Sequence, residues 1–357
     1  MNSKYIAILQ PEIPHYREEF FNKIREFVTT DIYVYNSFKH SKRQGFSLNT
    51  DNVSYIPNKK IKGILFYNPF VFFTHKYDTL VLMLHFAHIT TWLLLLTKFI
   101  HRKKIILWGQ GISIKRYLKE EKHPDWKLKL QIALSDGVWI YMEKEKTMWQ
   151  KIFPTKKIIA LNNTLTGLDE MVQYTSILSK EELKSKYKIK EEIILIFCAR
   201  FESSYRRTDL LIDTIRNLNN KKFGFIIIGS GKNKPDFTPY NNVYDFGAIY
   251  DTNTKQDLFS IADIYFQPGW VGLSIVEAMA YGKPIFTFIR SMETKQCVEY
   301  SYIKPGYNGL IFENIESCID TIQNLSKDFI YELGNNARAT AKILSPTNMV
   351  NAAITLL

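Results

Sequence analysis

Residues 266–284 have the sequence FQPGWVGLSIVEAMAYGKP, which combines the end of a strand, a loop and a helix. The strand should end at Pro268, before a loop that contains two glycines. A helix should begin near Leu273 and end at Gly282, and Pro284 should open the next strand. A strand, a loop and a helix in direct succession are typical of an α/β protein.

Apolar segments of strand length recur on both sides of this stretch. In the first half of the chain we predict strands at Tyr5–Leu9, Ile32–Tyr35, Leu80–Leu84, Ile105–Trp108 and Val138–Tyr141. In the second half we predict them at Ile193–Ala199, Phe225–Ile228, Val243–Phe246, Ile264–Gln267 and Pro284–Phe288. Helical segments such as Tyr16–Phe27 and Lys144–Lys151 lie between several of them. Strands that are apolar without alternation are covered by helices on both faces. We therefore predict an α/β fold of two doubly wound, Rossmann-like domains that face each other across a cleft.

The length of 357 residues is also too great for one ordinary core. The rhythm of strands and helices breaks between about Asn162 and Lys180. We place an N-terminal domain at residues 1–168 and a C-terminal domain at residues 169–345. Residues 346–357 should form a final helix, from Thr347, that packs back on the N-terminal domain.

Cysteine usage and the start of the chain favour a cytoplasmic protein. Cys198, Cys297 and Cys318 are widely spaced and form no disulfide framework. The apolar run Tyr5–Leu9 after Lys4 is too short for a signal peptide and is followed by no small-residue cleavage site.

The formal net charge of +12 favours an anionic partner, such as nucleotide phosphates, a membrane surface or nucleic acid. Part of this charge lies in the clusters at residues 59–60, 101–104 and 156–157, which suit a solvated face and an anionic membrane equally well. Nucleic acid is disfavoured because the aromatic residues lie in apolar runs, away from the basic clusters. Peripheral association with the inner face of a membrane therefore remains a candidate.

The apolar stretch Thr79–Ile100 resembles a membrane span, but His85 and His88 interrupt it. We predict a buried strand, a turn, and a helix from Trp92 to Phe99 instead. The two histidines should lie in the core or the turn, because no Asp, Glu or Cys stands near enough to complete a metal site.

The stretch at residues 266–284 also contains a candidate ligand site. Gly269 and Gly272 would let a ligand approach the backbone, and the amides of Gly272, Leu273 and Ser274 at the helix start could bind an anion. Glu277, one turn further, could accept hydrogen bonds from a ribose while the helix start holds phosphate. An acidic residue at this position also compensates the helix dipole, so the residues alone leave both roles open.

This stretch resembles the signature of the retaining, group 1 (family 4) nucleotide-sugar glycosyltransferases of the GT-B fold. Their motif is Glu, seven residues, Glu, and then Ala-Met-Ala-x-Gly-x-Pro. Glu277 matches the second Glu, which in the family binds the donor ribose. Gly269 stands where the first Glu would fall, so the usual contact to the transferred sugar is replaced.

The resemblance extends from about Ile193 to Phe312. Arg200 and Arg206 match a family Arg and Lys, and fixed cations of this kind stabilise the charge on a departing nucleoside diphosphate. In a polar loop, two arginines can also be simply solvated. Further donor-binding positions implied by the resemblance are Gly229, Gly231, Phe246 and Gly247. The segment around Gly229 and Gly231 lacks the spacing of a Walker motif.

The first half of the chain resembles the family more weakly. Tyr16 and Arg17 match a Tyr-Arg turn found in a subset of these enzymes, and Gln110 replaces the His of a Trp-Gly-His-Gly segment. These three residues are the candidates for the acceptor side.

The sequence contains no Asp-x-Asp carboxylate pair to hold magnesium or manganese on a diphosphate. We therefore expect no metal site and no cofactor beyond the nucleotide-sugar substrate. The arginines and the helix start would supply the positive charge.

The sequence therefore predicts a retaining glycosyltransferase of the hexosyltransferase type. Its donor would lie in the C-terminal domain and its acceptor, a glycan or lipid-linked glycan, on the N-terminal one. The resemblance implies a role in bacterial surface polysaccharide synthesis, such as capsule or O-antigen. Open alternatives are a nucleotide-sugar epimerase, a sugar-phosphate phosphorylase, and a degenerate subunit that binds nucleotide without transferring sugar.

Overall fold

The computed structural model describes residues 4–37 and 53–357. They divide into two compact units. The first unit comprises Met1–Thr166 together with Ser345–Leu357, and the second comprises Gly167–Leu344. The chain thus leaves the first unit once and returns to it at the C-terminus.

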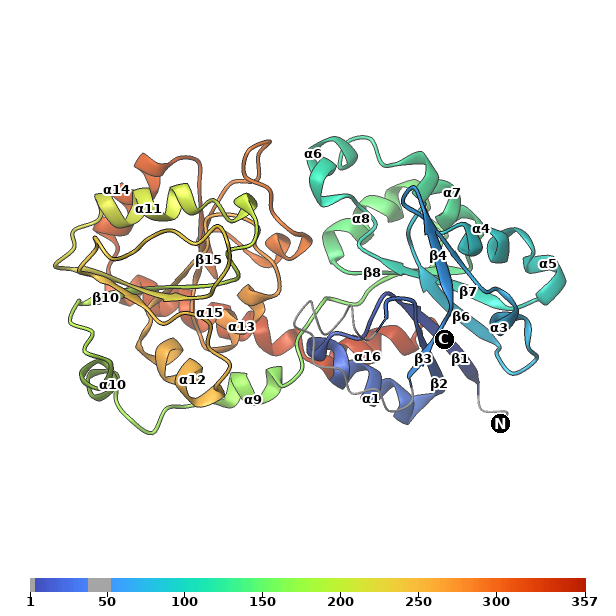
Figure 1. Cartoon of the computed structure of the whole chain (residues 1–357), viewed down its shortest axis with the longest axis horizontal. Helices are drawn as coiled ribbons and strands as arrows, with labels where there is room; N and C mark the ends of the chain where they lie inside the picture. Colours follow the sequence, from blue (N-terminus) through green and yellow to red (C-terminus); the bar gives the residue numbers. More distant parts are fainter. Residues whose placement is uncertain (1–3, 38–52) are drawn as a thin grey trace. The chain divides into compact units, whose positions relative to one another are not determined.

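The first unit is built on a parallel seven-stranded sheet with the order β3-β2-β1-β6-β7-β8-β9 (Figure 1). Its strands are β1 (Tyr5–Gln10), β2 (Thr29–Val34), β3 (Val53–Tyr55), β6 (Thr79–Met83), β7 (Lys104–Gly109), β8 (Gly137–Ile140) and β9 (Ile158–Ala160). A separate antiparallel hairpin consists of β4 (Asn58–Ile61) and β5 (Ile64–Tyr67). The strand order reverses between β1 and β6, as it does in doubly wound sheets.

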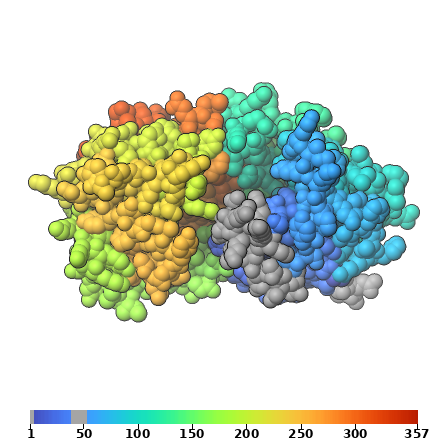
Figure 2. Space-filling view, viewed as in Figure 1, coloured from blue at the N-terminus to red at the C-terminus, as the bar shows by residue number. Residues whose placement is uncertain are grey.

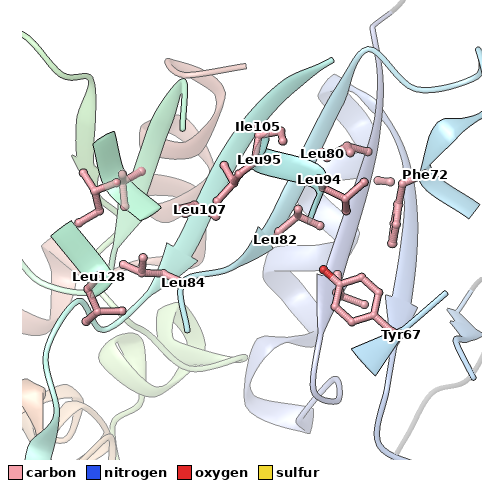
Figure 3. Packing of buried hydrophobic residues seen from close by; sticks show 14 of the residues in the cluster. Tyr67, Phe72, Leu80, Leu82, Leu84, Leu94, Leu95, Ile105, Leu107 and Leu128 are labelled. Carbon is pink, nitrogen blue, oxygen red and sulfur yellow. The ribbon is translucent and has the colours of Figure 1, made fainter. Parts of the chain in front are cut away.

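Helices cover both faces of this sheet. They are α1 (Glu18–Phe27), α3 (Phe70–Phe73), α4 (Ile89–Leu96), α5 (Lys98–His101), α6 (Tyr117–Glu120), α7 (Trp126–Leu134), α8 (Glu143–Ile152) and α16 (Pro346–Ile354), with short 3-10 turns η1 (His15–Arg17) and η2 (Ile114–Arg116). Side chains alternate along each strand, so β1 contributes to two cores. Ala7 and Leu9 join the cluster that contains Leu94 and Leu128 of α4 and α7, part of which is drawn in Figure 3. Ile6 and its neighbour Ile8 join the cluster under α1 and α16.

The C-terminal helix α16 is an integral part of the first unit. Met349 and Val350 are buried in the same cluster as Phe20 and Phe21 of α1. The hydroxyl of Ser345 accepts a hydrogen bond from the amide of Asn348, at 3.1 Å, and so caps the helix start.

The second unit is built on a parallel six-stranded sheet with the order β12-β11-β10-β13-β14-β15. Its strands are β10 (Ile193–Cys198), β11 (Phe223–Ile228), β12 (Val243–Asp245), β13 (Ile264–Phe266), β14 (Ile285–Phe288) and β15 (Gly309–Phe312). Its helices are α9 (Leu168–Gln173), α10 (Lys180–Tyr187), α11 (Thr208–Asn217), α12 (Thr252–Ile261), α13 (Ser274–Ala280), α14 (Ile315–Asn324) and α15 (Lys327–Ile343), with 3-10 turns η3 (Ser204–Arg206) and η4 (Val298–Tyr302). Figure 1 shows α11 and α14 on one face of this sheet and α12 on the other.

The predicted α/β class and both doubly wound sheets are confirmed, and each predicted strand overlaps an observed one. Thr79–Ile100 contains a strand, a turn and helical residues, as expected, but two helices, α4 and α5, take the place of the single helix predicted from Trp92 to Phe99. Within residues 4–37 and 53–357, every helix is too short or too polar to cross a membrane. The short strands β3, β4, β5, β9 and β15 lie outside the predicted set.

Candidate functional site

The candidate donor residues of the second unit gather where the strand order of its sheet reverses, between β10 and β13. Ligands of doubly wound proteins bind outside the carboxyl ends of the strands at this switch point. Strand β10 ends at Cys198 and β13 at Phe266. The hydroxyl of Tyr265 donates to the Cys198 carbonyl at 2.9 Å and so ties the two strand ends together.

Arg206 joins two loops at this switch point. Its Nε donates to the carbonyl of Arg200 at 3.2 Å, and its Nη1 donates to the carbonyl of Trp270 at 2.8 Å. Burial lowers the pKa of the Arg206 guanidinium. Arg200 is exposed at the surface of the same loop. The structure thus brings both predicted arginines together and gives Arg206 a structural duty in addition to the predicted one.

Glu277 forms an ion pair that the sequence did not indicate. Lys255 of α12 places its Nζ 2.6 Å from Oε1 and 2.8 Å from Oε2 of Glu277. Burial alone would lower the pKa of Lys255, but the Glu277 carboxylate outweighs it and leaves the pKa above its ordinary value. Burial raises the pKa of the neighbouring Cys198 thiol to about 11. The lysine is therefore a permanent cation next to the predicted ribose carboxylate.

A buried glutamine holds the loop that connects β13 to α13. The Nε2 of Gln267 donates to the carbonyls of Gly269 and Trp270, at 3.1 and 2.8 Å. Its Oε1 accepts a hydrogen bond from the hydroxyl of Ser274 at 2.9 Å and lies 2.8 Å from the hydroxyl oxygen of Tyr265. Both sides of the amide are used, so the loop and the helix start are fixed to the strand.

A second buried glutamine, Gln296, also forms hydrogen bonds to the loop between β13 and α13. The Oε1 of Gln296 accepts the amide of Val271 at 2.8 Å, and its Nε2 donates to the carbonyl of Phe288 at 2.9 Å. The backbone amide of Trp270 donates to the carbonyl of Lys295 at 2.7 Å. The loop is therefore preorganised by hydrogen bonds on both flanks.

The structure explains why glycine stands at position 269. A Cβ there would lie 2.4 Å from the carbonyl oxygen of Tyr205 and 2.9 Å from Cγ of Arg207. The next residue, Trp270, has a positive φ of 53° and stacks on the Tyr205 ring, with 4.8 Å between ring centroids. A residue with a Cβ therefore does not fit at position 269 while the Tyr205 carbonyl is in this place.

The remaining predicted donor residues border the same strand ends. Gly229 and Gly231 have positive φ angles of 149° and 145°, and a Cβ at Gly229 would meet the Ala199 carbonyl oxygen at 2.0 Å. The amide of Gly229 donates to the carbonyl of Gly247 at 2.7 Å. Phe246 lies half-buried against the ring of Tyr187. The loops after β10, β11 and β12 are therefore adjacent, as their predicted common role requires.

Helix α13 starts at Ser274, and its N-cap residue Leu273 makes no side-chain capping hydrogen bond. The carbonyl of Gly272 accepts the amide of Ile275 at 3.1 Å. The helix start therefore lies at the predicted position, directly after the loop fixed by Gln267.

In the first unit, Arg17 is buried among aromatic rings. Its guanidinium lies 4.7 Å from the ring centre of Tyr141 and 5.1 Å from that of Trp108, and its Nη2 donates to Asn163 at 3.1 Å. Such cation–π contacts stabilise the η1 turn that carries the half-buried Tyr16. We conclude that Arg17 positions this turn.

Gln110 follows directly on β7 and is half-buried. Trp108, two residues earlier, contacts Arg17, so Gln110 lies at the same sheet edge as the η1 turn. At the end of the neighbouring strand β6, the rings of His85 and His88 stack with 4.8 Å between their centres. Burial lowers the pKa of His88 to about 3, so this imidazole is neutral.

The described residues contain no cluster of three or more His, Cys, Asp or Glu side chains suited to a metal ion. His85 and His88 lie in the turn, where the sequence placed them.

The residues that sequence reasoning missed are Lys255, Gln267 and Gln296. Lys255 lies in a different helix from Glu277, 22 residues away, and no local pattern links them. Gln267 did carry a signal, because it is a polar residue at the end of an otherwise apolar strand.

A family model and several known proteins resemble this chain. Residues 192–328 match the model of the family Glycosyl transferases group 1. An uncharacterized glycosyltransferase of Haemophilus influenzae is 29% identical over 201 residues, an alignment that covers 53% of this chain and 51% of that protein. The chain thus spans about half the length of this curated relative.

Two solved structures share the fold over almost the whole chain. HepE of Anabaena, in complex with UDP, has a TM-score of 0.66 and 16% identity, covering 99% of this chain and 98% of its own. A mutant of S. aureus TarM, in complex with fondaparinux, alpha-GlcNAc-glycerol and UDP, has a TM-score of 0.62 and 13% identity, covering 99% of both chains.

The two doubly wound units and these likenesses define the GT-B class of fold. Within that class, residues 192–328 of the second unit are similar to the family Glycosyl transferases group 1.

Proposed function

We propose that this protein transfers a sugar from a nucleotide-diphosphate sugar to a hydroxyl group of a glycan or a lipid-linked glycan. The observation that carries the proposal is the coincidence of two results. The group 1 family match covers residues 192–328, and within this range Arg200, Arg206 and the pair of Lys255 and Glu277 lie near the end of β10 at Cys198. HepE and TarM are both in complex with UDP, so a uridine nucleotide is the first donor to test.

The predicted roles follow from charge and position. Arg200 and Arg206 would face the diphosphate, and the amides of Gly272 to Ser274 would add hydrogen bonds. Glu277, held by Lys255, would accept the ribose hydroxyls with its remaining lone pairs. Side-chain cations in this number can balance a diphosphate without a divalent ion, which supports transfer independent of metal.

The resemblance favours retention of configuration. The bond from the anomeric carbon to phosphate would break while the acceptor oxygen bonds on the same face of the sugar. The departing phosphate oxygen would take the acceptor's proton. A side-chain base is then unnecessary, which is compatible with Gln110 in place of the family His.

A surface of the first unit suits a lipid-linked acceptor at a membrane. We define the apolar–basic surface by its exposed apolar and basic side chains on the β4–β5 hairpin, α3, α4 and α5: Ile61, Ile64, Phe66, Phe70, Leu93, Leu96, Phe99 and Ile100, with Lys59, Lys60, Lys62 and Arg102. Phe99 is 78% exposed and Phe70 76% exposed, which is unusual for phenylalanine. The hairpin, in blue, lies at the surface of the first unit in Figure 2.

The other basic clusters are largely structural. Lys103 donates to the carbonyls of Thr74 and Tyr77, both at 2.6 Å, and Lys156 donates to that of Ser135 at 2.6 Å. Lys59 and Lys60 of the apolar–basic surface are both exposed, so their charge is available to an anionic membrane. We propose peripheral attachment there, consistent with a role in surface polysaccharide synthesis such as capsule or O-antigen.

The decisive experiment is product analysis with a panel of nucleotide sugars and glycan acceptors, run with wild type, Arg206→Ala and Glu277→Ala. A new glycoside, formed without added metal and lost in both variants, supports the proposal, and the anomeric configuration of the product tests retention. Turnover of the donor alone would indicate an epimerase. Nucleotide binding without any product would indicate a degenerate subunit.

Attachment to the membrane is tested by co-sedimentation with anionic and neutral vesicles at low and high salt. Replacement of Leu96 and Phe99 by Ser should abolish binding, whereas Phe27→Ser, a similarly exposed phenylalanine on α1, should not change it. Equal binding of the surface variant and wild type would refute attachment through this surface.

A further inference from the structure

A polar cavity lies at the amino ends of strands β10 and β13 of the second sheet, whereas the candidate donor residues lie at their carboxyl ends. It has a volume of about 570 Å³ and is bounded by α10, α15 and the turn between α13 and β14. Ile193, at the start of β10, and Asp263, directly before β13, line it as well. The candidate donor residues border the other ends of these strands, so the cavity is separate from them.

Cationic side chains dominate the lining of this cavity. Five of them border it: Lys180, Lys184, Lys283, Lys327 and Arg338. Three carboxylates border it as well, Glu181, Glu192 and Asp263. The cavity therefore has an excess of two positive charges.

Each carboxylate is already paired with a lysine. Lys180 lies 2.5 Å from Asp263, and Lys327 lies 2.8 Å from Glu192. The remaining pair joins the buried Lys184 to Glu181 on the same helix, at 3.3 Å. Each of the three carboxylates that line the cavity is therefore already neutralised by a lysine.

The two cations outside these pairs are neighbours. Within residues 4–37 and 53–357, Lys283 and Arg338 have no carboxylate at ion-pair distance. The ammonium of Lys283 donates to the carbonyl of Ala262 at 2.7 Å. The guanidinium of Arg338 lies over Gly282, with its Nε 3.2 Å from where a Cβ would stand.

The electrostatics of Lys283 reflect the same excess charge. Burial lowers the pKa of this lysine to about 8, with further lowering by Lys180 and Arg338, and Asp263 opposes the change only in part. A positive group in this position is stabilised by a bound anion.

We propose that this cavity binds a small phosphate monoester, with its phosphate between Lys283 and Arg338. Arginine and lysine are the side chains that recognise phosphate, and the guanidinium fork fits two phosphate oxygens. The cavity is far larger than a phosphate group and falls in the usual range for small-molecule sites. Ile193, Ile330 and the ring of Tyr281 line it as well, so it can enclose the organic part of the molecule.

Isothermal titration with glucose 1-phosphate and with inorganic phosphate tests the proposal, with glucose as the uncharged control at matched ionic strength. Wild type should bind the two phosphates and not glucose. Tighter binding of glucose 1-phosphate would identify the organic ester as the preferred ligand, and equal binding would identify phosphate itself. The first result supports the monoester, and the second overturns it in favour of phosphate itself.

Four variants locate the site. Lys283→Met and Arg338→Gln should each weaken binding by about tenfold or more, because each removes a charge-assisted hydrogen bond. Lys342→Met removes an exposed charge from the same helix, and Arg206→Gln removes a cation of the candidate donor site, so neither should change the affinity. Arg338 is half-buried and forms no ion pair in the described part of the chain, so its variant should fold even if Lys283→Met does not.

The absence of phosphate binding by wild type at millimolar concentration would overturn the proposal. Binding that survives Arg338→Gln, or that disappears in Arg206→Gln, would overturn it as well. The latter result would place the phosphate at the donor site.

Discussion

At the scale of single residues, position 269 is where this chain departs most clearly from the family motif. We predict that Gly269→Ala lowers the free energy of unfolding by about 1–3 kcal/mol, because the new Cβ would overlap the Tyr205 carbonyl oxygen. Gly272→Ala is the matched control in the same loop, since its Cβ would come no closer than 3.7 Å to Cys297. Urea unfolding measures both, and equal stability of the two variants would contradict the close packing at Gly269.

The pair of Lys255 and Glu277 supports a second prediction at this scale. Lys255→Met should lower the free energy of unfolding by about 1–3 kcal/mol, because it leaves a largely buried carboxylate without its cation. The double variant with Glu277→Gln should recover part of this loss. A double-mutant cycle by chemical unfolding gives the coupling energy, and strictly additive losses would show that the pair is not coupled.

The contribution of the pair of Lys255 and Glu277 to the free energy of unfolding should decrease only at high pH. The pKa of Lys255 is raised in the folded state, so its contribution is complete below the unfolded pKa of about 10.4 and disappears only as the pH rises through the folded value. The stability difference between wild type and Lys255→Met should therefore be constant from about pH 6 to pH 9.

The sequence was sufficient to predict the motif residues of the candidate site, but it did not indicate the residues that contact them. Arg206 and Glu277 were identified by spacing within short segments. Lys255 and Gln296 come from distant segments whose local sequence has no feature tied to the site. They contact the site only because the fold brings α12 and the loop before η4 to the end of β13. A single sequence contains no local pattern that predicts this tertiary contact.

At the scale of elements, the packing of helix α16 against the core of the first unit can be tested by substitution. Met349→Ala should lower the stability of the first unit by about 2–5 kcal/mol, because this side chain is 2% exposed within the core under α1. Asn351→Ala, on the exposed side of the same helix, should change it by less than about 0.5 kcal/mol. Thermal unfolding followed by circular dichroism measures both, and similar effects of the two substitutions would contradict the packing.

Elements were predictable where burial leaves a continuous apolar run. Strands such as β10 and β11 are covered on both faces and satisfy that condition along their whole length. The hairpin strand β4 has the sequence NKKI and is mostly exposed, so its pairing depends on β5 and leaves no apolar pattern. Strands β9 and β15 have three and four residues, as do the predicted strands β13 and β14, so their length does not explain why they lie outside the predicted set.

At the scale of the whole molecule, each unit has a hydrophobic core of its own. Domains of this kind can unfold separately, so calorimetry should resolve two transitions. Met349→Ala lies in the core of the first unit and should lower only one of them, which assigns that transition to the first unit.

Once each unfolding transition is assigned to a unit, the effect of a nucleotide on the two transitions shows which unit binds it. If UDP binds at the switch point of the second sheet, a concentration of about 100 times its dissociation constant should stabilise the second unit by ~2.7 kcal/mol and leave the first unit's transition in place. The argument rests on linkage, because a ligand stabilises only the cooperative unit whose folded form it binds. Arg206→Ala should remove the shift while keeping both transitions. A shift of the Met349-sensitive transition would instead place the nucleotide on the first unit, against the assignment of the donor to Arg200, Arg206 and Glu277.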